Sequence, residues 1–135
     1  MKPTKLNHLG IAVHDLDAAA RIYQALGLYV EKIVDVPEQQ VRVAFIPVGE
    51  STIELVQPTS PDSTIARFLE KNGEGLHHLA LQVSDVQASL GELQAQGIQL
   101  INEAPRHGAE GLIAFLHPKS TGRVLIELVE TTADH

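Results

Sequence analysis

The chain contains two copies of one sequence unit, because residues 7–30 align without a gap on residues 77–100. The similarity continues beyond these segments: Ala44-Phe45 corresponds to Ala114-Phe115, and Ile53–Val56 corresponds to Ile126–Val129 after three extra residues in the second copy. A repeat that keeps its order over about 55 residues predicts two similar structural modules. The identical positions in the aligned segments are His8/His78, Leu9/Leu79, Val13/Val83, Asp15/Asp85, Ala18/Ala88, Gln24/Gln94, Ala25/Ala95 and Gly27/Gly97.

Each copy has the pattern of a strand followed by a capped helix. In the first copy, Asp15 offers an N-cap to a helix whose apolar residues recur at helical spacing, and Gly27 suits the position after its end. In the second copy, Ser84 or Asp85 opens the equivalent helix and Gly97 closes it.

Three further strands are expected after each helix, with Gly49-Glu50 as the turn of a hairpin in the first copy. A linker helix is expected to begin in Ser60–Ser63 and to end at Asn72-Gly73. The expected strands after the helices are Tyr29–Val34, Gln40–Pro47 and Ser51–Val56 in the first copy, and Ile98–Glu103, Gly111–His117 and Gly122–Val129 in the second.

The predicted fold class is α+β, with two tandem βαβββ modules. A length of 135 residues suits one domain. We therefore expect a single domain over 1–135, with module one at about 5–57, the linker helix at about 60–73 and module two at about 76–131.

Composition excludes several classes of function. A formal net charge of −7 argues against non-specific nucleic-acid binding, which depends on a surplus of Lys and Arg. No apolar run has the roughly 20 residues that a membrane span needs. The absence of Cys excludes disulfides, thiolate metal sites and a Cys nucleophile. We expect a cytoplasmic protein that binds neither nucleic acid nor membranes.

Four polar residues at repeat-matched positions stand out from apolar strands. His8 and His78 match each other at the start of a strand, and Glu54 and Glu127 match each other within Ile-Glu-Leu-Val segments. If the modules pack with pseudo-twofold symmetry, the four side chains converge. Neutral imidazoles with carboxylate oxygens suit an octahedral divalent metal such as Mn, Co, Ni, Zn or Fe(II).

Each of these residues also has a simpler interpretation. A single His at a strand start is more often a structural residue, and a Glu with apolar neighbours usually lies on the solvent face of its strand. The coincidence of both pairs under one repeat alignment favours a shared site. His77 is expected to point to the opposite face from His78 and to have a supporting or structural role.

The chain resembles the vicinal oxygen chelate superfamily, which includes glyoxalase I, extradiol dioxygenases, antibiotic resistance proteins and acyl-CoA epimerases. The resemblance covers nearly the whole chain and is closest to the methylmalonyl-CoA epimerases. Its signatures are more specific than the bare His and Glu pattern, and they lie in Asn7–Val13, Asp62–His78 and Phe115–Lys119.

The resemblance implies a cleft formed by the two modules and metal-dependent epimerisation of (2R)- and (2S)-methylmalonyl-CoA through an enolate, as in propionate metabolism. It implies one divalent ion (Co, Mn, Ni, Mg or Zn), and Glu127 as one acid/base group as well as a ligand. Some relatives have Gln at the position of Glu54. Several similar epimerases have a Glu at the position of Val43, so the second acid/base group is not identified. The implied metal ligands are His8, Glu54, His78 and Glu127.

Coenzyme A requires cationic or hydrogen-bonding groups for its phosphates. A solvated turn with scattered charges would contain the same kinds of residue, so these positions have a simpler interpretation as well. The candidates lie in turns of the second module: Arg106, Lys119, Ser120 and Arg123.

Other functions remain as alternatives. The first is a glyoxalase I-like lyase acting on a glutathione hemithioacetal, and the second is a non-catalytic, resistance-type protein that binds a small molecule. An extradiol dioxygenase ranks lower, because its iron site uses two His and one carboxylate. Superfamily members often pair through edge strands, so a homodimer is expected.

Overall fold

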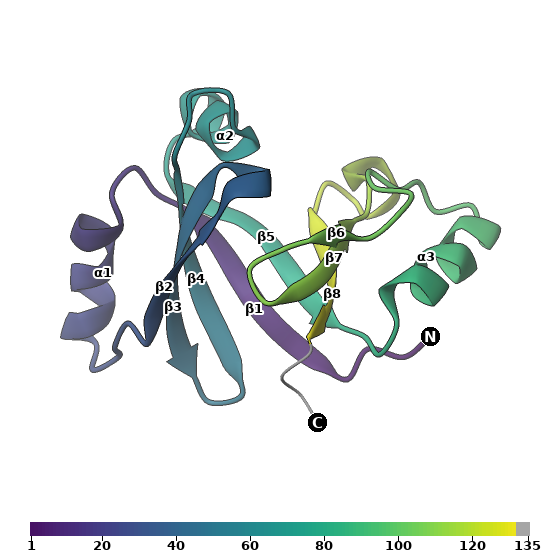
Figure 1. The fold of residues 1–135 in the computed structure, drawn as a ribbon, viewed down its shortest axis with the longest axis horizontal. Helices are drawn as coiled ribbons and strands as arrows, with labels where there is room; N and C mark the ends of the chain where they lie inside the picture. Colours follow the sequence, from purple (N-terminus) through teal and green to yellow (C-terminus); the bar gives the residue numbers. More distant parts are fainter. Residues whose placement is uncertain (132–135) are drawn as a thin grey trace. The chain divides into compact units, whose positions relative to one another are not determined.

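A computed structural model describes residues 1–131 of the chain. These residues form two compact units (Figure 1). The first unit is His8–His77. The second unit comprises Met1–Asn7 and the chain from His78 onward.

The first unit contains four strands in the order β2-β3-β4-β1. Strand β1 is parallel to β4, whereas β2, β3 and β4 form an antiparallel meander. Its elements are β1 (Lys5–Ala12), α1 (Leu16–Ala25), β2 (Lys32–Val36), a 3₁₀ turn (Pro37–Gln39), β3 (Val41–Val48), β4 (Ser51–Pro58) and α2 (Thr64–Asn72).

The second unit repeats this arrangement, with strands in the order β5-β8-β7-β6. Strand β5 is parallel to β8, and β7 is antiparallel to both β8 and β6. Its elements are β5 (Gly75–Gln82), α3 (Val86–Ala95), β6 (Arg106–His107), β7 (Gly111–Phe115), a 3₁₀ turn (Pro118–Ser120) and β8 (Ile126–Thr131). The predicted βαβββ pattern is confirmed in both units.

The helix boundaries follow the predicted caps. The carboxylate of Asp15 accepts hydrogen bonds from the backbone of Asp17 and Ala18, and Asp85, rather than Ser84, caps α3 in the same way. Such caps satisfy backbone donors that the first helical turn leaves unpaired. Helix α2 starts after Ser63, whose buried hydroxyl accepts from the backbone of Ala66.

Three predicted strands differ from the structure. The strand expected at Tyr29–Val34 is observed as β2 at Lys32–Val36. Residues 98–103 form no strand and make only an isolated bridge between Leu100 and Leu116. The Asn102 side chain accepts the backbone N–H of Phe115, thirteen residues along the chain, which a neighbouring strand would otherwise use. Strand β8 begins at Ile126 rather than Gly122, since the preceding residues form a turn.

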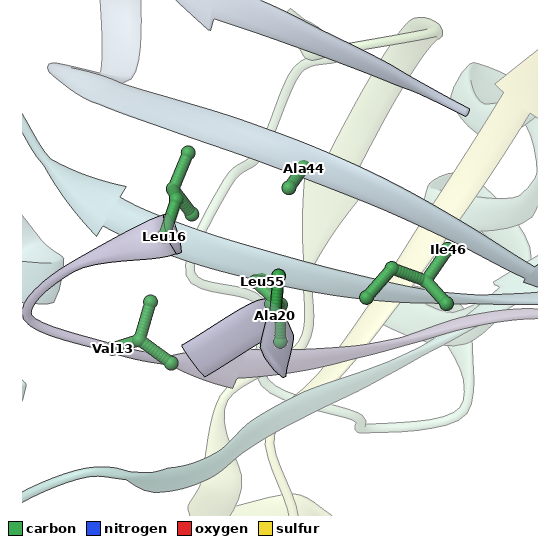
Figure 2. Close-up of a cluster of buried hydrophobic side chains, with 6 residues drawn as sticks. All are labelled: Val13, Leu16, Ala20, Ala44, Ile46 and Leu55. Atoms are coloured by element: carbon green, nitrogen blue, oxygen red, sulfur yellow. The ribbon is translucent and has the colours of Figure 1, made fainter. Parts of the chain in front are cut away.

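A helix covers one face of each set of strands. In the first unit, α1 packs on β3 and β4 through small and branched side chains, which Figure 2 shows: Val13, Leu16, Ala20, Ala44, Ile46 and Leu55. In the second unit, the equivalent cluster consists of Val83, Val86, Leu90, Ala114, Leu116 and Leu128.

Side-chain alternation along the strands then places the polar residues on the other face. Because Leu55 and Leu128 face the helices, their neighbours Glu54 and Glu127 face away from them. No helix among the described residues has the length and apolar character needed to cross a membrane.

Candidate metal centre

In the first unit, a buried imidazole lies against a buried carboxylate. His8 Nδ1 is 3.1 Å from an Oε atom of Glu54, and both side chains are about 5% exposed. His8 comes from β1 and Glu54 from the adjacent parallel strand β4. The packing of α1 on the opposite face fixes which residues of these strands point this way.

The second unit has the equivalent pair. His78 Nε2 is 3.2 Å from an Oε atom of Glu127, and both side chains are buried. The ring of His78 also meets that of Phe115 edge to face, with centroids 5.7 Å apart. These two residues stand on β5 and β8, as His8 and Glu54 stand on β1 and β4.

Strand register makes the two pairs structurally equivalent. Glu54 lies opposite Gly10 on one side and Phe45 on the other. Glu127 lies opposite Ala80 and Phe115. Each His is two residues before the Gly or Ala, so it occupies the same place relative to its Glu in both units. The full matched sets are His8, Gly10, Phe45 and Glu54 against His78, Ala80, Phe115 and Glu127.

The donor atoms of each pair fit a divalent cation. Two neighbouring ligands that meet at a right angle at an ion about 2.1 Å away are about 3.0 Å apart. The His–Glu separations of 3.1 and 3.2 Å agree with this value. A buried carboxylate is costly unless hydrogen bonds or an opposite charge compensate it. The donor chemistry within each pair therefore suits a divalent ion.

The neighbouring His77 has a different environment from His78, as the sequence predicts. Its ring meets Phe68 of α2 edge to face at 4.8 Å within the first unit. His77 is half-buried, whereas His78 is buried beside Glu127.

Val43 lies on β3 on the same face as Glu54 and is buried between two other valines. Its register partners are Val34 and Val56. The flanking Arg42 donates from Nε to a carboxylate oxygen of Asp35 at 2.9 Å. This hydrogen bond and the negative charge of Asp35 raise the pKa of the Arg42 guanidinium. Neither the two valines nor the Arg42 guanidinium is suited to accepting a proton at neutral pH.

Three of the four candidate CoA-binding residues lie on one turn. Lys119, Ser120 and Arg123 follow β7, and Arg123 N–H closes the turn on the carbonyl of Pro118. The hydroxyl of Ser120 accepts the backbone N–H of Gln99. The fourth, Arg106, is exposed on the short strand β6, where it pairs with Ile113 of β7.

The phenylalanines beside the two carboxylates were not identified as site residues from the sequence. The repeat matches Phe45 to Phe115, but only the strand register puts each directly opposite its Glu. The ammonium group of Lys32 lies 4.8 Å from the centroid of the Phe45 ring, and no sequence pattern indicated this contact.

Comparison with known proteins places this geometry in context. Residues 7–115 match the family model of the Glyoxalase/Bleomycin resistance protein/Dioxygenase superfamily.

Similar proteins include the mitochondrial methylmalonyl-CoA epimerase of Homo sapiens. It is 42% identical over 127 residues, which cover 92% of this chain and 72% of the human protein. The ethylmalonyl-CoA/methylmalonyl-CoA epimerase of Cereibacter sphaeroides is 41% identical over 128 residues, covering 92% and 96% of the two chains.

Among solved structures, a similar one is a Streptomyces coelicolor methylmalonyl-CoA epimerase variant in complex with 2-nitronate-propionyl-CoA. Its TM-score is 0.93 at 39% identity, and the match covers 98% of this chain and 97% of that one.

Proposed function

Because the chain belongs to the Glyoxalase/Bleomycin resistance protein/Dioxygenase superfamily, we propose that it uses the two His–carboxylate pairs to epimerise methylmalonyl-CoA. The single observation that carries this proposal is the pair of equivalent buried sites, His8–Glu54 and His78–Glu127. Their presence in a chain about 40% identical to methylmalonyl-CoA epimerases supports the substrate.

We propose that both pairs hold one divalent metal ion. His8 and His78 supply nitrogen, and Glu54 and Glu127 supply oxygen, in accordance with the donor separations within each pair. When bound, such an ion supplies Lewis-acid stabilisation of negative charge on the substrate's oxygen atoms. The two units accordingly act as one functional domain.

The reaction moves one proton at the substrate's α-carbon, which lies between a thioester and a carboxylate. We assign its removal to the carboxylate of Glu127, which becomes protonated as the C–H electron pair is delocalised into the thioester carbonyl. Phe115 lies directly opposite Glu127 in the register, and the Glu127 side chain is buried. Such shielding strengthens electrostatic interactions at the reacting atoms.

The coenzyme A portion is assigned to cationic groups of the second unit. Lys119 and Arg123 are exposed on one turn, and Ser120 on the same turn and the exposed Arg106 on β6 are the other candidates. Charge-assisted contacts with phosphate oxygens are stronger than neutral hydrogen bonds.

Removal of one phosphate contact is expected to weaken substrate binding without changing the chemistry. Arg123→Ala and Lys119→Ala should each raise KM by roughly five- to tenfold with little change in kcat. Steady-state kinetics on both variants measures this, with Lys71→Ala as the control, since Lys71 is an exposed cation at the end of α2. An unchanged KM in both variants would place the CoA phosphates elsewhere.

A comparison of two substrates tests the proposed activity. Metal-loaded protein is incubated in parallel with a single epimer of methylmalonyl-CoA and with the hemithioacetal of glutathione and methylglyoxal. We expect the first to become a mixture of epimers and the second to remain unchanged. Turnover of the hemithioacetal alone would favour the lyase, and turnover of neither would favour a binding protein.

The expected homodimer and cytoplasmic location remain part of the proposal. Light scattering should give a mass twice that of the 14.6 kDa chain. A mass near that of one chain would contradict the dimer.

A further inference from the structure

Lys32 stands in the same cross-strand row as the Glu54 carboxylate of the first unit. It pairs with Phe45 in the register of β2 and β3, and Phe45 pairs with Glu54 in the register of β3 and β4. Register partners on adjacent strands point to the same face of a sheet. Lys32, Phe45 and Glu54 therefore share the face that lies opposite to helix α1.

Lys32 is the one Lys or Arg among the described strand residues of the first unit that point to this face. Apart from His8 and Glu54, the other residues at these register positions are Val, Pro, Ala, Gly, Phe45 and a single Thr. The nearby Arg42 is at the alternate position of β3 and pairs with Asp35. The face thus offers an anionic group a single cation beside apolar side chains.

The ammonium group of Lys32 is held over the Phe45 ring. It lies 4.8 Å from the ring centroid, within the range in which an aromatic face attracts a cation. Because Phe45 is buried, this contact keeps the ammonium beside the sheet. In the part of the chain that the structure describes, the exposed Lys32 has no carboxylate partner. An ammonium has three N–H donors, so the ring contact leaves donors for a ligand.

The position of this ammonium favours the acyl end of the proposed substrate. Adjacent strands are about 4.8 Å apart, and the ammonium lies over a residue of β3, the strand next to the one that carries Glu54. The free carboxylate of methylmalonyl-CoA is attached directly to the α-carbon, whereas the phosphates lie at the far end of the pantetheine chain. A substrate that binds beside Glu54 through its acyl oxygens brings its carboxylate within reach of Lys32 and leaves its phosphates beyond it.

We propose that Lys32 is a substrate-binding residue that donates a charge-assisted hydrogen bond to the free carboxylate of the acyl group. This contact selects a thioester with a carboxylate on its α-carbon over a simple acyl-CoA, because the simple thioester leaves the ammonium without an anionic partner. The inference rests on the proposed epimerase function, since it takes the acyl end of the substrate to lie beside Glu54. It assigns Lys32 to binding and not to proton transfer.

Two thioesters that differ only in this carboxylate test the inference. Calorimetry measures the Kd of an equilibrium mixture of methylmalonyl-CoA epimers and the Kd of propionyl-CoA, for Mn²⁺-loaded wild-type protein and for Lys32→Met. Methionine keeps an apolar side chain on the Phe45 ring but loses the charge. Arg21→Met is the matched control, because it removes the same charge from the exposed surface of α1, on the other face of the sheet.

The wild-type protein should bind methylmalonyl-CoA more tightly than propionyl-CoA. Lys32→Met should weaken binding of methylmalonyl-CoA by about tenfold, as expected for one charge-assisted hydrogen bond, and should leave the Kd of propionyl-CoA within about twofold. Lys32→Arg should recover most of the affinity, because it restores a cation. Arg21→Met should keep both wild-type values, and the thermal melts of all variants should match that of the wild type.

Three results would contradict the assignment. The first is a wild-type protein that binds both thioesters equally well. The second is equal weakening of both thioesters by Lys32→Met, which would place the ammonium on a phosphate of coenzyme A. The third is an unchanged Kd for both, which would limit Lys32 to its contact with Phe45.

Failure of the proposed function has a different signature, because it is measured as inversion at the α-carbon by the wild-type protein. A protein that shows the Lys32-dependent preference for the carboxylate but inverts neither epimer would keep the binding assignment and lose the epimerase activity.

Discussion

Replacement of His78 by alanine is expected to remove stoichiometric divalent metal and to lower α-proton exchange on the order of 10²-fold or more. The imidazole is buried beside Glu127, so its loss removes a nitrogen donor that no neighbouring side chain replaces in kind. A bound metal contributes several kcal/mol of charge stabilisation, and about 1.4 kcal/mol corresponds to a factor of ten in rate. Elemental analysis and an exchange assay in D₂O measure the two effects.

The adjacent histidine provides a matched control for this substitution. His77→Ala should keep its metal and its activity, because His77 packs on Phe68 rather than on a carboxylate. Its cost should be limited to about 1 kcal/mol of folding free energy, the usual contribution of an aromatic pair. Loss of metal from His77→Ala with retention in His78→Ala would mean that the ligand has been assigned to the wrong histidine.

Removal of the metal from the wild-type protein is expected to lower its stability and abolish exchange. In the folded protein, the ion adds ligand bonds to two carboxylates that are already buried beside imidazoles, Glu54 beside His8 and Glu127 beside His78. An ion present at about 100 times its Kd stabilises the folded state by about 2.7 kcal/mol, which corresponds to a rise in Tm of roughly 10 °C for a chain of this size. Calorimetry of chelator-treated protein before and after readdition of Mn²⁺ measures this difference.

The variant His78→Ala serves as the control for the metal effect. It should melt at the same temperature with and without added metal, since it lacks one of the proposed ligands. A wild-type Tm that does not respond to any of the candidate ions would argue against a structural contribution of the metal.

The repeat explains why much of the fold was predictable from the sequence. Caps such as Asp15 and Asp85, and the glycines that follow the helices, are local signals that act within a few residues. They therefore located the helices closely. The missing strand at residues 98–103 depended instead on Asn102, whose side chain contacts a strand thirteen residues away. A local pattern does not contain such a contact.

The candidate site was predictable only in part, for a related reason. The matched positions of His8 and His78, and of Glu54 and Glu127, indicated four polar residues with a shared role. Pairing within each unit follows from parallel strand contacts, which join residues more than forty positions apart. For the same reason, the equivalent placement of Phe45 and Phe115 became clear only from the strand register.

Proton exchange at the substrate's α-carbon tests the central claim most directly. Wild-type protein loaded with Co²⁺ is incubated in D₂O with one epimer of methylmalonyl-CoA, and NMR follows the α-carbon after removal of protein and metal. The account predicts deuterium at this carbon together with the opposite epimer. No exchange above the protein-free blank, with metal bound at stoichiometric level, would contradict the account.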